Sequence, residues 1–247
     1  MKTIYILWKR QLIKYFRSKS RIIGSLGQPL LFLIALGFGF GPIYVKAGGG
    51  NYIQFLAPGI IAMSILFSSI FSGIEIIWDR QFGFLKETLV APVSRFKIMI
   101  GRTLGGATVA LLQGTIVLVI TLFVGFRSNL MLLPFAFIFM ALISMLFTAL
   151  GTAIASMLED MQGFQLIMNF LIMPIFFLSG ALFPLQGLPK AISIITLINP
   201  LTYGVDGLRG TLANLSSFGL FNDFAVLTII AVVLLWVGSY LFSKIQV

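Results

Sequence analysis

Few side chains in this sequence could act as a nucleophile, a base or a metal ligand. The chain has no Cys and no His, which excludes thiol chemistry, imidazole bases, disulfides and the usual zinc ligands. The remaining acids are seven carboxylates, each expected in a loop or near the end of an apolar segment: Glu75, Asp79, Glu87, Glu159, Asp160, Asp206 and Asp223. Ion-coupled transporters usually need an ionisable group near the membrane midplane. We therefore predict no catalytic residue and no metal site, and the pattern disfavours an ion-coupled carrier.

A nucleotide site is also absent from the sequence, because no segment matches the phosphate-binding pattern G-x-x-x-x-G-K-[ST]. If ATP drives this protein, hydrolysis takes place on another chain, and this chain must offer a docking surface. The best candidate is the segment 79–98, where Phe82, Leu85 and Leu89 fall on one face of a short helix. Lys86 flanks this face and Glu87 points away from it. Such a helix could pack into a groove of a partner or rest on the lipid surface.

The composition is typical of a membrane protein. Hydrophobic residues make up 59% of the chain and charged residues 10%, and the mean hydropathy is +1.06. Soluble proteins carry about 25% charged residues. Because a spanning helix needs about 20 apolar residues, six spans are predicted, at about 22–45, 54–78, 103–126, 131–157, 162–182 and 220–243. The expected fold class is all-α: a polytopic membrane protein with one transmembrane domain over residues 1–247.

The basic residues indicate how these spans are oriented. Thirteen of the 17 Lys and Arg flank the spans on the side of the N-terminus, and four lie on the other side: Lys46, Arg127, Lys190 and Arg209. Basic residues mark cytoplasmic loops, so both termini are predicted in the cytoplasm, with the chain in a prokaryotic cytoplasmic membrane. The net charge of +10 then reflects membrane topology, and no nucleic-acid partner is predicted.

Two segments accompany the spans without crossing the membrane. Residues 1–21 predict an amphipathic helix in the headgroup layer, with its cations toward anionic lipid. Its inward face is expected to carry Tyr5, Trp8, Leu12 and Tyr15. Residues 183–219 are interrupted by proline, and they predict two short re-entrant helices that dip into the outer leaflet and return. An ordinary extracellular loop is the alternative.

Several polar side chains lie within or near the apolar runs: Gln28, Gln54, Gln113, Gln165 and Asn169. They could line a translocation path or form hydrogen bonds between helices. The spacing Gly101-xxx-Gly105 permits close approach of two helices. Asp206 and Arg209 are three residues apart, so they could pair on one helical turn and hold the outer segment in shape.

Two motifs carry a resemblance to a known family. The run Asp79-Arg80-Gln81-Phe82-Gly83-Phe84-Leu85-Lys86-Glu87-Thr88-Leu89, followed by Ala91-Pro92 and Ser94-Arg95, resembles the cytoplasmic loop of type-2 ATP-binding-cassette (ABC) transporter permeases. The run Asn199-Pro200-Leu201-Thr202-Tyr203, continuing through Asp206 and Leu208-Arg209, resembles the segment before the last span in that family. With the six spans and the basic N-terminus, the resemblance covers nearly the whole chain. Within that family, the chain is most similar to the branch associated with export of antibiotics and lipo-oligosaccharides.

The resemblance implies a permease that works as a dimer, here a homodimer, with each protomer docked on a separate ATPase subunit that binds ATP and Mg. The coupling residues that it implies are Phe82, Phe84, Leu85, Lys86, Glu87 and Leu89. The outer re-entrant gate that it implies contains Phe183, Pro184, Asn199, Pro200 and Tyr203. Our hypothesis is the permease subunit of an ATP-driven exporter of an amphipathic or lipid-linked substrate. The alternatives are an ion-coupled carrier or channel without an ATPase partner, and a non-transporting assembly factor; an intramembrane enzyme is disfavoured.

Overall fold

The computed structural model describes residues 2–47, 50–84 and 93–244, and every regular element within these ranges is a helix. In chain order the helices are α1 (Lys2–Arg17), α2 (Lys19–Lys46), α3 (Tyr52–Phe71), α4 (Ile74–Gln81), α6 (Arg95–Phe123), α7 (Leu133–Met157), α8 (Met161–Ile167), α9 (Met173–Phe177), α10 (Lys190–Ile198), α11 (Pro200–Ala213) and α12 (Leu220–Ser243). A π-helical turn, Met168–Ile172, joins α8 to α9. The predicted all-α class is confirmed.

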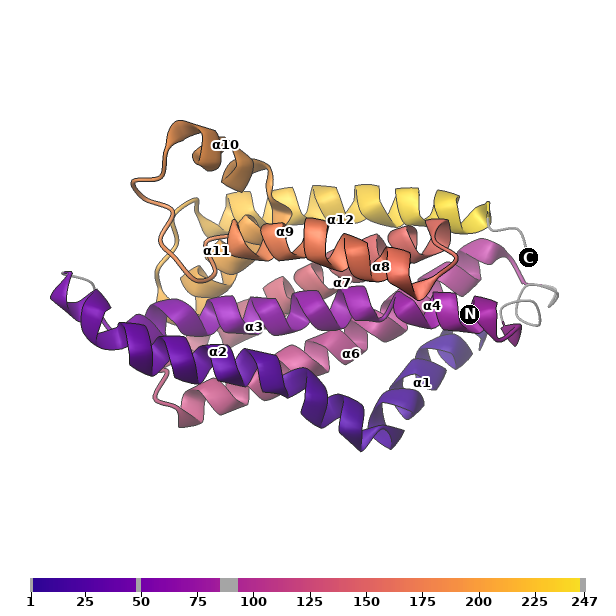
Figure 1. Cartoon of the computed structure of the whole chain (residues 1–247), viewed down its shortest axis with the longest axis horizontal. Coiled ribbons are helices and arrows are strands. Elements are labelled where there is room, and N and C mark those ends of the chain that lie inside the picture. Colours follow the sequence, from indigo (N-terminus) through magenta and orange to yellow (C-terminus); the bar gives the residue numbers. More distant parts are fainter. Residues whose placement is uncertain (1, 48–49, 85–92, 245–247) are drawn as a thin grey trace.

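Five segments are long and apolar enough to cross a membrane, and they run along the long axis of the molecule (Figure 1). They are Lys19–Lys46, Tyr52–Gln81, Arg95–Phe123, Leu130–Met157 and Leu220–Ser243. They correspond to predicted spans one to four and six. The third begins earlier than predicted, since α6 starts at Arg95, so the connection to it is shorter than the predicted segment 79–98.

The predicted fifth span, 162–182, is a shorter apolar helix, Met161–Phe177, with the π-helical turn inside it. At 1.5 Å per residue this helix is about 25 Å long, somewhat less than the hydrocarbon thickness of about 30 Å. It ends before the predicted boundary because the chain turns at Gly180, whose φ of 75° is readily adopted only by glycine. The next pair, α10 and α11, meets at an angle of 82°, which fits either a broken span or a re-entrant loop.

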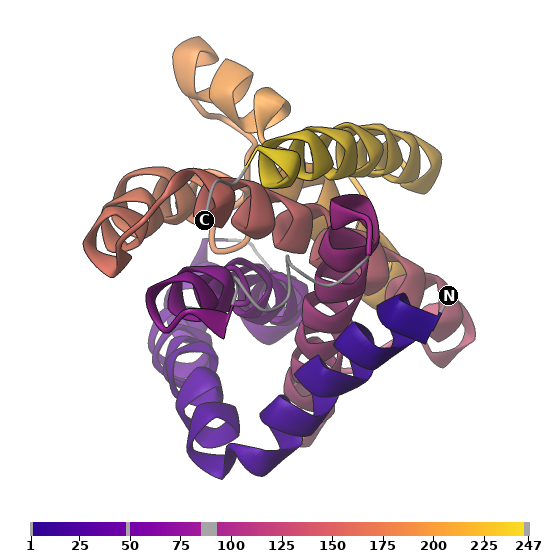
Figure 2. The same ribbon diagram turned by 90° about the vertical axis from the view of Figure 1, so that its right-hand side faces the viewer.

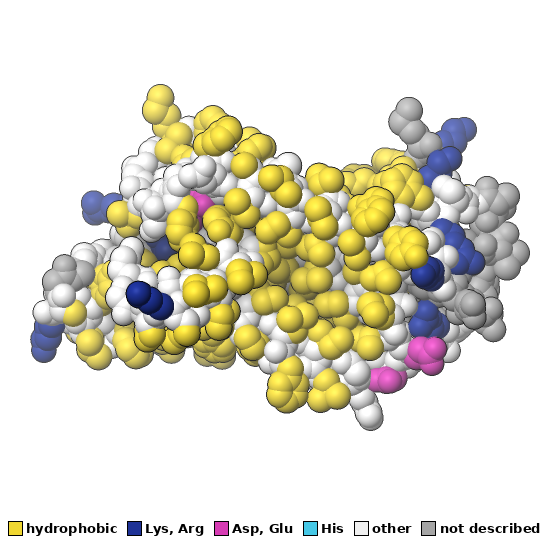
Figure 3. All heavy atoms as spheres, turned by 90° about the horizontal axis from the view of Figure 1, so that it is seen from above, with side chains coloured by type: hydrophobic (Ala, Val, Ile, Leu, Met, Phe, Trp, Pro, Cys, Tyr) yellow, Lys and Arg dark blue, Asp and Glu magenta, His cyan; other side chains and the backbone are white. Residues whose placement is uncertain are grey.

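The core of the bundle lies around α3. In the most apolar stretch of Tyr52–Gln81, 72% of residues are buried, against 17% for α2 and for α12. α3 packs against α2, α6, α7 and α11, whereas α2 and α12 expose large apolar side chains such as Phe38 and Trp236. Figure 3 shows hydrophobic side chains over the middle of the molecule and most Lys and Arg at its two ends. This distribution is the one a multi-pass membrane protein needs, and it confirms that class.

One end of the bundle gathers the start of α1, the end of α4, the start of α6 and the end of α12 (Figure 1). A guanidinium Nη1–H of Arg95, at the start of α6, donates to the carbonyl of Ser243 at 2.6 Å, which joins α6 to the end of α12. The turn between α2 and α3 and the pair α10–α11 lie at the opposite end. We refer to these as the terminal end and the far end.

α1 packs along α6 at the terminal end (Figure 2). Leu7 and Tyr15 are buried, and the indole Nε1–H of Trp8 donates to Thr108 Oγ1 at 2.9 Å. Tyr5, which the sequence places on the inward face of the helix, is 57% exposed and takes no part in this contact; its orientation toward the membrane stays a prediction. One face of α1 therefore packs against α6, and the opposite face is exposed. Gly101 and Gly105 permit this approach, since a Cβ at position 105 would lie 2.6 Å from Gln11 Cγ.

We predict that Gly105→Leu destabilises the protein by about 1–3 kcal/mol, because the added side chain must displace α1 from α6. The matched control is Gly39→Leu in α2, where an added Cβ meets nothing within 4 Å. Thermal unfolding of both variants in detergent, followed by tryptophan fluorescence, measures the difference. Equal unfolding temperatures for the two variants would contradict the packing described here.

Candidate functional site

The helix α4 presents two carboxylates on one face. Ser72 and Gly73 separate it from α3, and Gly73 lies so close to the carbonyl of Gly151 in α7 that a Cβ would collide with it. α4 then carries Glu75 and Asp79, which lie four residues apart and so on the same side of the helix. Both residues are buried, 5% and 6% exposed. Buried carboxylates are stable only with partners, and each of these has two.

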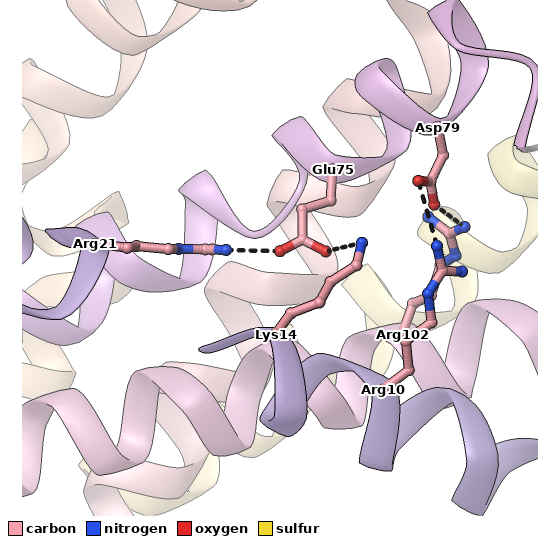
Figure 4. A network of polar contacts seen from close by, with 6 residues as sticks. All are labelled: Arg10, Lys14, Arg21, Glu75, Asp79 and Arg102. Carbon is pink, nitrogen blue, oxygen red and sulfur yellow. Dashed lines mark hydrogen bonds and ion pairs between the residues drawn. The ribbon is translucent and has the colours of Figure 1, made fainter. Parts of the chain in front are cut away.

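Glu75 is held between two cations from different helices (Figure 4). Nη1 of Arg21, in α2, lies 2.7 Å from one carboxylate oxygen, and Nζ of Lys14, in α1, lies 3.4 Å from the other. The two cations remain about one third exposed or more while the carboxylate is buried. Glu75 therefore links α4 to both α1 and α2.

Asp79 is held in the same way, one helical turn further along α4 (Figure 4). A guanidinium nitrogen of Arg102, in α6, donates to one oxygen, and Nη2 of Arg10, in α1, lies 3.6 Å from the other. Arg102 is itself buried, and its Nε and Nη1 have no hydrogen-bond partner among the described residues. This ion pair is thus shielded from water on both sides.

We call these six residues the charge network: Arg10, Lys14, Arg21, Glu75, Asp79 and Arg102. They come from α1, α2, α4 and α6. A buried charge whose partner is removed costs about 3–5 kcal/mol, so these helices cannot separate at this point without rearranging the network. The network thereby makes the terminal end of the bundle a connected unit.

The helix α4 is also tied to the opposite side of the bundle. Arg80 donates through Nη1 to the carbonyl of Leu158 at 3.0 Å, just after α7 ends. Gln81 donates through Nε2 to the carbonyl of Glu159 at 3.4 Å, in the turn that leads into α8. Together with the bond from Arg95 to Ser243, both helices that flank residues 82–94 are bound to their neighbours by side chains.

A cavity of about 430 Å³ adjoins the charge network, between the start of α2 and the end of α3 with α4. Arg21 and Glu75 line the charged part of it, and Phe71 and Trp78 are among its apolar walls. Its lining also includes hydroxyl and amide side chains: Ser25, Gln28, Ser64 and Ser68. The volume is within the range of small-molecule sites.

The predicted coupling residues are described only in part. Phe82, which follows α4, is 72% exposed, and Phe84 is 52% exposed. Both side chains are accessible at the terminal end, as a docking surface requires. Leu85, Lys86, Glu87 and Leu89 lie outside the described residues, so the predicted helical face stays a prediction.

The residues of the predicted outer gate serve to fold the far end. Asn199 caps α11 by accepting from the Leu201 N–H at 3.0 Å, and its Nδ2 donates to the carbonyl of Ile175 at 2.6 Å. Pro200 occupies the first turn of α11, where a missing N–H costs nothing. The Tyr203 hydroxyl donates to the carbonyl of Leu197 at 2.8 Å. Phe183 is half exposed, and Pro184 lines a separate cavity of about 290 Å³. Their role as a gate stays a prediction.

The predicted ion pair between Asp206 and Arg209 is wrong. Asp206 instead accepts from the Ser216 hydroxyl and from the Ser217 and Phe218 N–H groups, so it closes the loop after α11. Arg209 donates to the carbonyls of Phe55 and Gly180 and lies over the Phe55 ring at 3.9 Å. These loop amides and carbonyls need partners in the buried far end, and the two side chains supply them.

The five polar residues named for a translocation path have different surroundings, and Gln165 is exposed in α8. Gln28 lines the cavity beside the charge network. Gln113 is buried and accepts from the Tyr15 hydroxyl at 2.6 Å; burial raises the pKa of Tyr15, so the hydroxyl stays protonated and donates. Gln54, with its amide oriented to satisfy both groups, pairs with the backbone of Arg127 at the far end. Asn169 is exposed in the π-helical turn. At least Gln113 and Gln54 therefore form bonds between segments.

The charge network itself was missed by reasoning from the sequence. The sequence places Glu75 and Asp79 in a loop or near the end of a span, and it assigns Arg10 and Lys14 to the cationic face of an amphipathic helix. The available signal was the spacing of the two carboxylates, which places them on one helical face directly after an apolar run. The partners on α1 and α6 could not be chosen from many basic residues without the packing of α1 on α6.

Together these features define a multi-pass helical membrane protein whose charged end is tied to the segment between its second and third spans. The chain matches the family model described as ABC-2 type transporter over residues 2–213. It is 31% identical to the transport permease ycf38 of Cyanophora paradoxa, over 98% of this chain and 88% of that protein. It is 30% identical to nodulation protein J of Rhizobium leguminosarum bv. viciae, over 84% of this chain and 78% of that protein.

The chain belongs to the ABC-2 type transporter family. It is a transport permease, the membrane subunit of an ABC transporter, and not an enzyme. The predicted family is confirmed, and membership implies an ABC ATPase as partner.

We predict that Asp79→Asn destabilises the protein by about 3–5 kcal/mol, because Arg102 is left buried without its counter-charge. The control is Glu159→Gln, which removes an exposed carboxylate at the same end. Adding Arg102→Gln to Asp79→Asn should restore part of the loss, since the two effects are coupled. Unfolding midpoints of the single and double variants test this. Additive losses would show that the pair does not interact as described.

Proposed function

We propose that two copies of this permease and two ATPase subunits form an exporter in the cytoplasmic membrane, with the terminal end of each permease in the cytoplasm. The excess of basic residues on the side of the termini supports this orientation, because basic residues are enriched in cytoplasmic loops. The segment around residues 82–94 then faces the ATPase subunit that the family implies. ATP and Mg bind on that subunit, and this chain supplies no group to the hydrolysis.

The observation that carries this proposal is the connection of the segment's two ends to the bundle. Before the segment, Asp79 pairs with Arg102 of α6, and Arg80 donates to a carbonyl just after α7. After the segment, Arg95 donates to a carbonyl of α12. A displacement of the segment by the ATPase therefore pulls on α1, α6, α7 and α12 together. In our proposal, closure of the ATPase dimer moves this unit and changes access to the substrate site from the terminal end to the far end.

The substrate we propose is amphipathic or lipid-linked, and export carries it from the cytoplasmic side or inner leaflet outward. The cavity beside the charge network supports this choice, since it combines charged groups with apolar walls at the level where a span ends. At the far end, α10 and α11 would close the exit, held by the contacts of Asn199 and Tyr203. The two arrangements must differ in affinity for the substrate, because a population shift requires differential binding.

Charging the exposed surface of the segment should prevent association with the ATPase. We predict that Phe82→Asp and Leu85→Asp each lower recovery of the ATPase subunit at least tenfold when the tagged permease is isolated from native membranes in mild detergent. The physical reason is that a carboxylate cannot be buried in an apolar contact without a partner. Mass spectrometry of the recovered complex measures the ratio of the two subunits.

The matched control for this experiment is Leu215→Asp, which places the same charge on an exposed leucine at the far end. It should leave ATPase recovery unchanged. Undiminished recovery with Phe82→Asp and Leu85→Asp, at equal membrane insertion, would contradict the assigned docking surface. A wild-type permease that is isolated without any ATPase, under conditions that preserve other complexes, would contradict the proposed exporter.

A further inference from the structure

The cavity beside the charge network has two chemically distinct parts. Phe67, Phe71, Ile74 and Trp78 supply an apolar wall from α3 and α4. Arg21 and Glu75 lie at the charged part, where the rest of the charge network continues. Such a combination suits a ligand with a charged headgroup and an apolar tail better than a wholly polar solute.

One buried side chain of the cavity wall offers a hydroxyl to a ligand. Ser64 is 3% exposed, and its hydroxyl has no hydrogen-bond partner among the described residues, whereas the buried Ser144, Ser156 and Ser179 each bond to a carbonyl one turn earlier. Ser69 also has no such partner, but it does not line the cavity. Buried polar atoms are rarely left without a partner. Ser64 lines the cavity, so a polar group of a bound molecule could satisfy it.

The sign of the charge on that ligand follows from the charge network. Glu75 is already shared by Lys14 and Arg21, and Asp79 by Arg10 and Arg102, so neither carboxylate lacks a counter-charge. Four cations face two carboxylates, which leaves an excess of positive charge. Lys14, Arg10 and Arg21 have side chains that are 35–40% exposed, so they can bind a further anion without losing Glu75 or Asp79. A cationic ligand would have to compete with them.

We propose that this cavity binds the phosphate headgroup of an anionic amphiphile, with the phosphate against Arg21 and the first part of the tail along Phe71 and Trp78. The inference deepens the proposed function, on which it rests for the assignment of this end to the inner leaflet, by naming the headgroup of the substrate class. A lipid of the surrounding membrane and a transported lipid-linked substrate share this chemistry.

The test uses the full chain, purified in mild detergent and titrated with phosphatidylglycerol or phosphatidylcholine, with bound lipid counted by native mass spectrometry. Phosphatidylglycerol should fill one site at least about fivefold more tightly than phosphatidylcholine. Both lipids carry a phosphate, but the excess cations repel the choline ammonium, at about 1 kcal/mol per charge near a membrane surface. Inorganic phosphate in excess should not displace it, because the tail contributes to binding.

Three substitutions separate the proposed site from general attraction to a basic surface. Arg21→Gln should weaken binding of phosphatidylglycerol about fivefold, while Glu75→Gln should strengthen it, since two cations are released. Gly24→Leu should abolish the tight site, because Gly24 lines the cavity and an added Cβ there meets nothing within 4 Å that would disturb folding. The matched control is Gly27→Leu, also in open space but not in the cavity lining, which should bind as the wild type does.

Several results would overturn the inference. These are equal affinity for the two lipids, displacement by inorganic phosphate alone, identical behaviour of Gly24→Leu and Gly27→Leu, or loss of binding in Glu75→Gln together with tight binding of an alkyltrimethylammonium. The proposed function is tested separately, by recovery of the ATPase with the same variants. Loss of the lipid site with the ATPase still bound to Gly24→Leu leaves the exporter proposal standing, whereas failure to recover the ATPase with the wild type contradicts the proposal itself.

To distinguish the two sources of the phosphate, the complex with its ATPase is loaded with phosphatidylglycerol and supplied with ATP. Retention of the lipid through turnover assigns the site to a resident membrane lipid. Its release, or its competition by a transported lipid-linked substrate, assigns the site to the transport route. Either result supports a site for a phosphate-bearing amphiphile. Failure of both phosphatidylglycerol and the lipid-linked substrate to bind would contradict it.

Discussion

The terminal end of this permease depends on the cost of burying Glu75 and Asp79. A carboxylate removed from water without a partner costs several kcal/mol, and α4 places two of them inside the bundle, one turn apart. Their partners come from three other helices, so satisfying these charges fixes the position of α1 on α6, the start of α2 and the orientation of α4. Glycines 101 and 105 allow α1 to come close enough for Arg10 and Lys14 to reach them.

This arrangement restrains α4 and α6 more than it restrains α2. The unit around α4 and α6 is tied by charges and by the bonds from Arg80 and Arg95 to α7 and α12. α2, by contrast, is mostly exposed along its apolar length and is held at this end chiefly through Arg21 and Glu75. In a membrane its exposed face contacts lipid or a second subunit. A ligand that binds at Arg21 would therefore act on a helix that is mostly exposed along its length.

Much of the fold could be predicted from the sequence because bilayer thickness sets the length of each apolar run. Five spans follow from this constraint alone, and the N-terminal helix follows from the helical spacing of its apolar residues. The ends were harder to predict: α6 begins at Arg95 because a helix can extend past the apolar region, and the fifth helix ends at the turn near Gly180. The charge network was not predictable, since which cation meets Glu75 or Asp79 depends on packing between helices distant in sequence. Asp206 and Arg209 have ideal spacing for a pair, but buried carbonyls and amides nearby compete for them.

The central claim is that the charge network makes α1, α4 and α6 move as one body with the ATPase. The chain has no native cysteine, so exposed Lys9 of α1 and Lys97 of α6 can each be replaced by Cys and spin-labelled. The distance between the two labels is then measured in the complex without nucleotide and with ATP bound. The account predicts that the Lys9–Lys97 distance within a protomer stays constant while the Lys97–Lys97 distance between protomers changes. A change within the protomer as large as the change between protomers would contradict it.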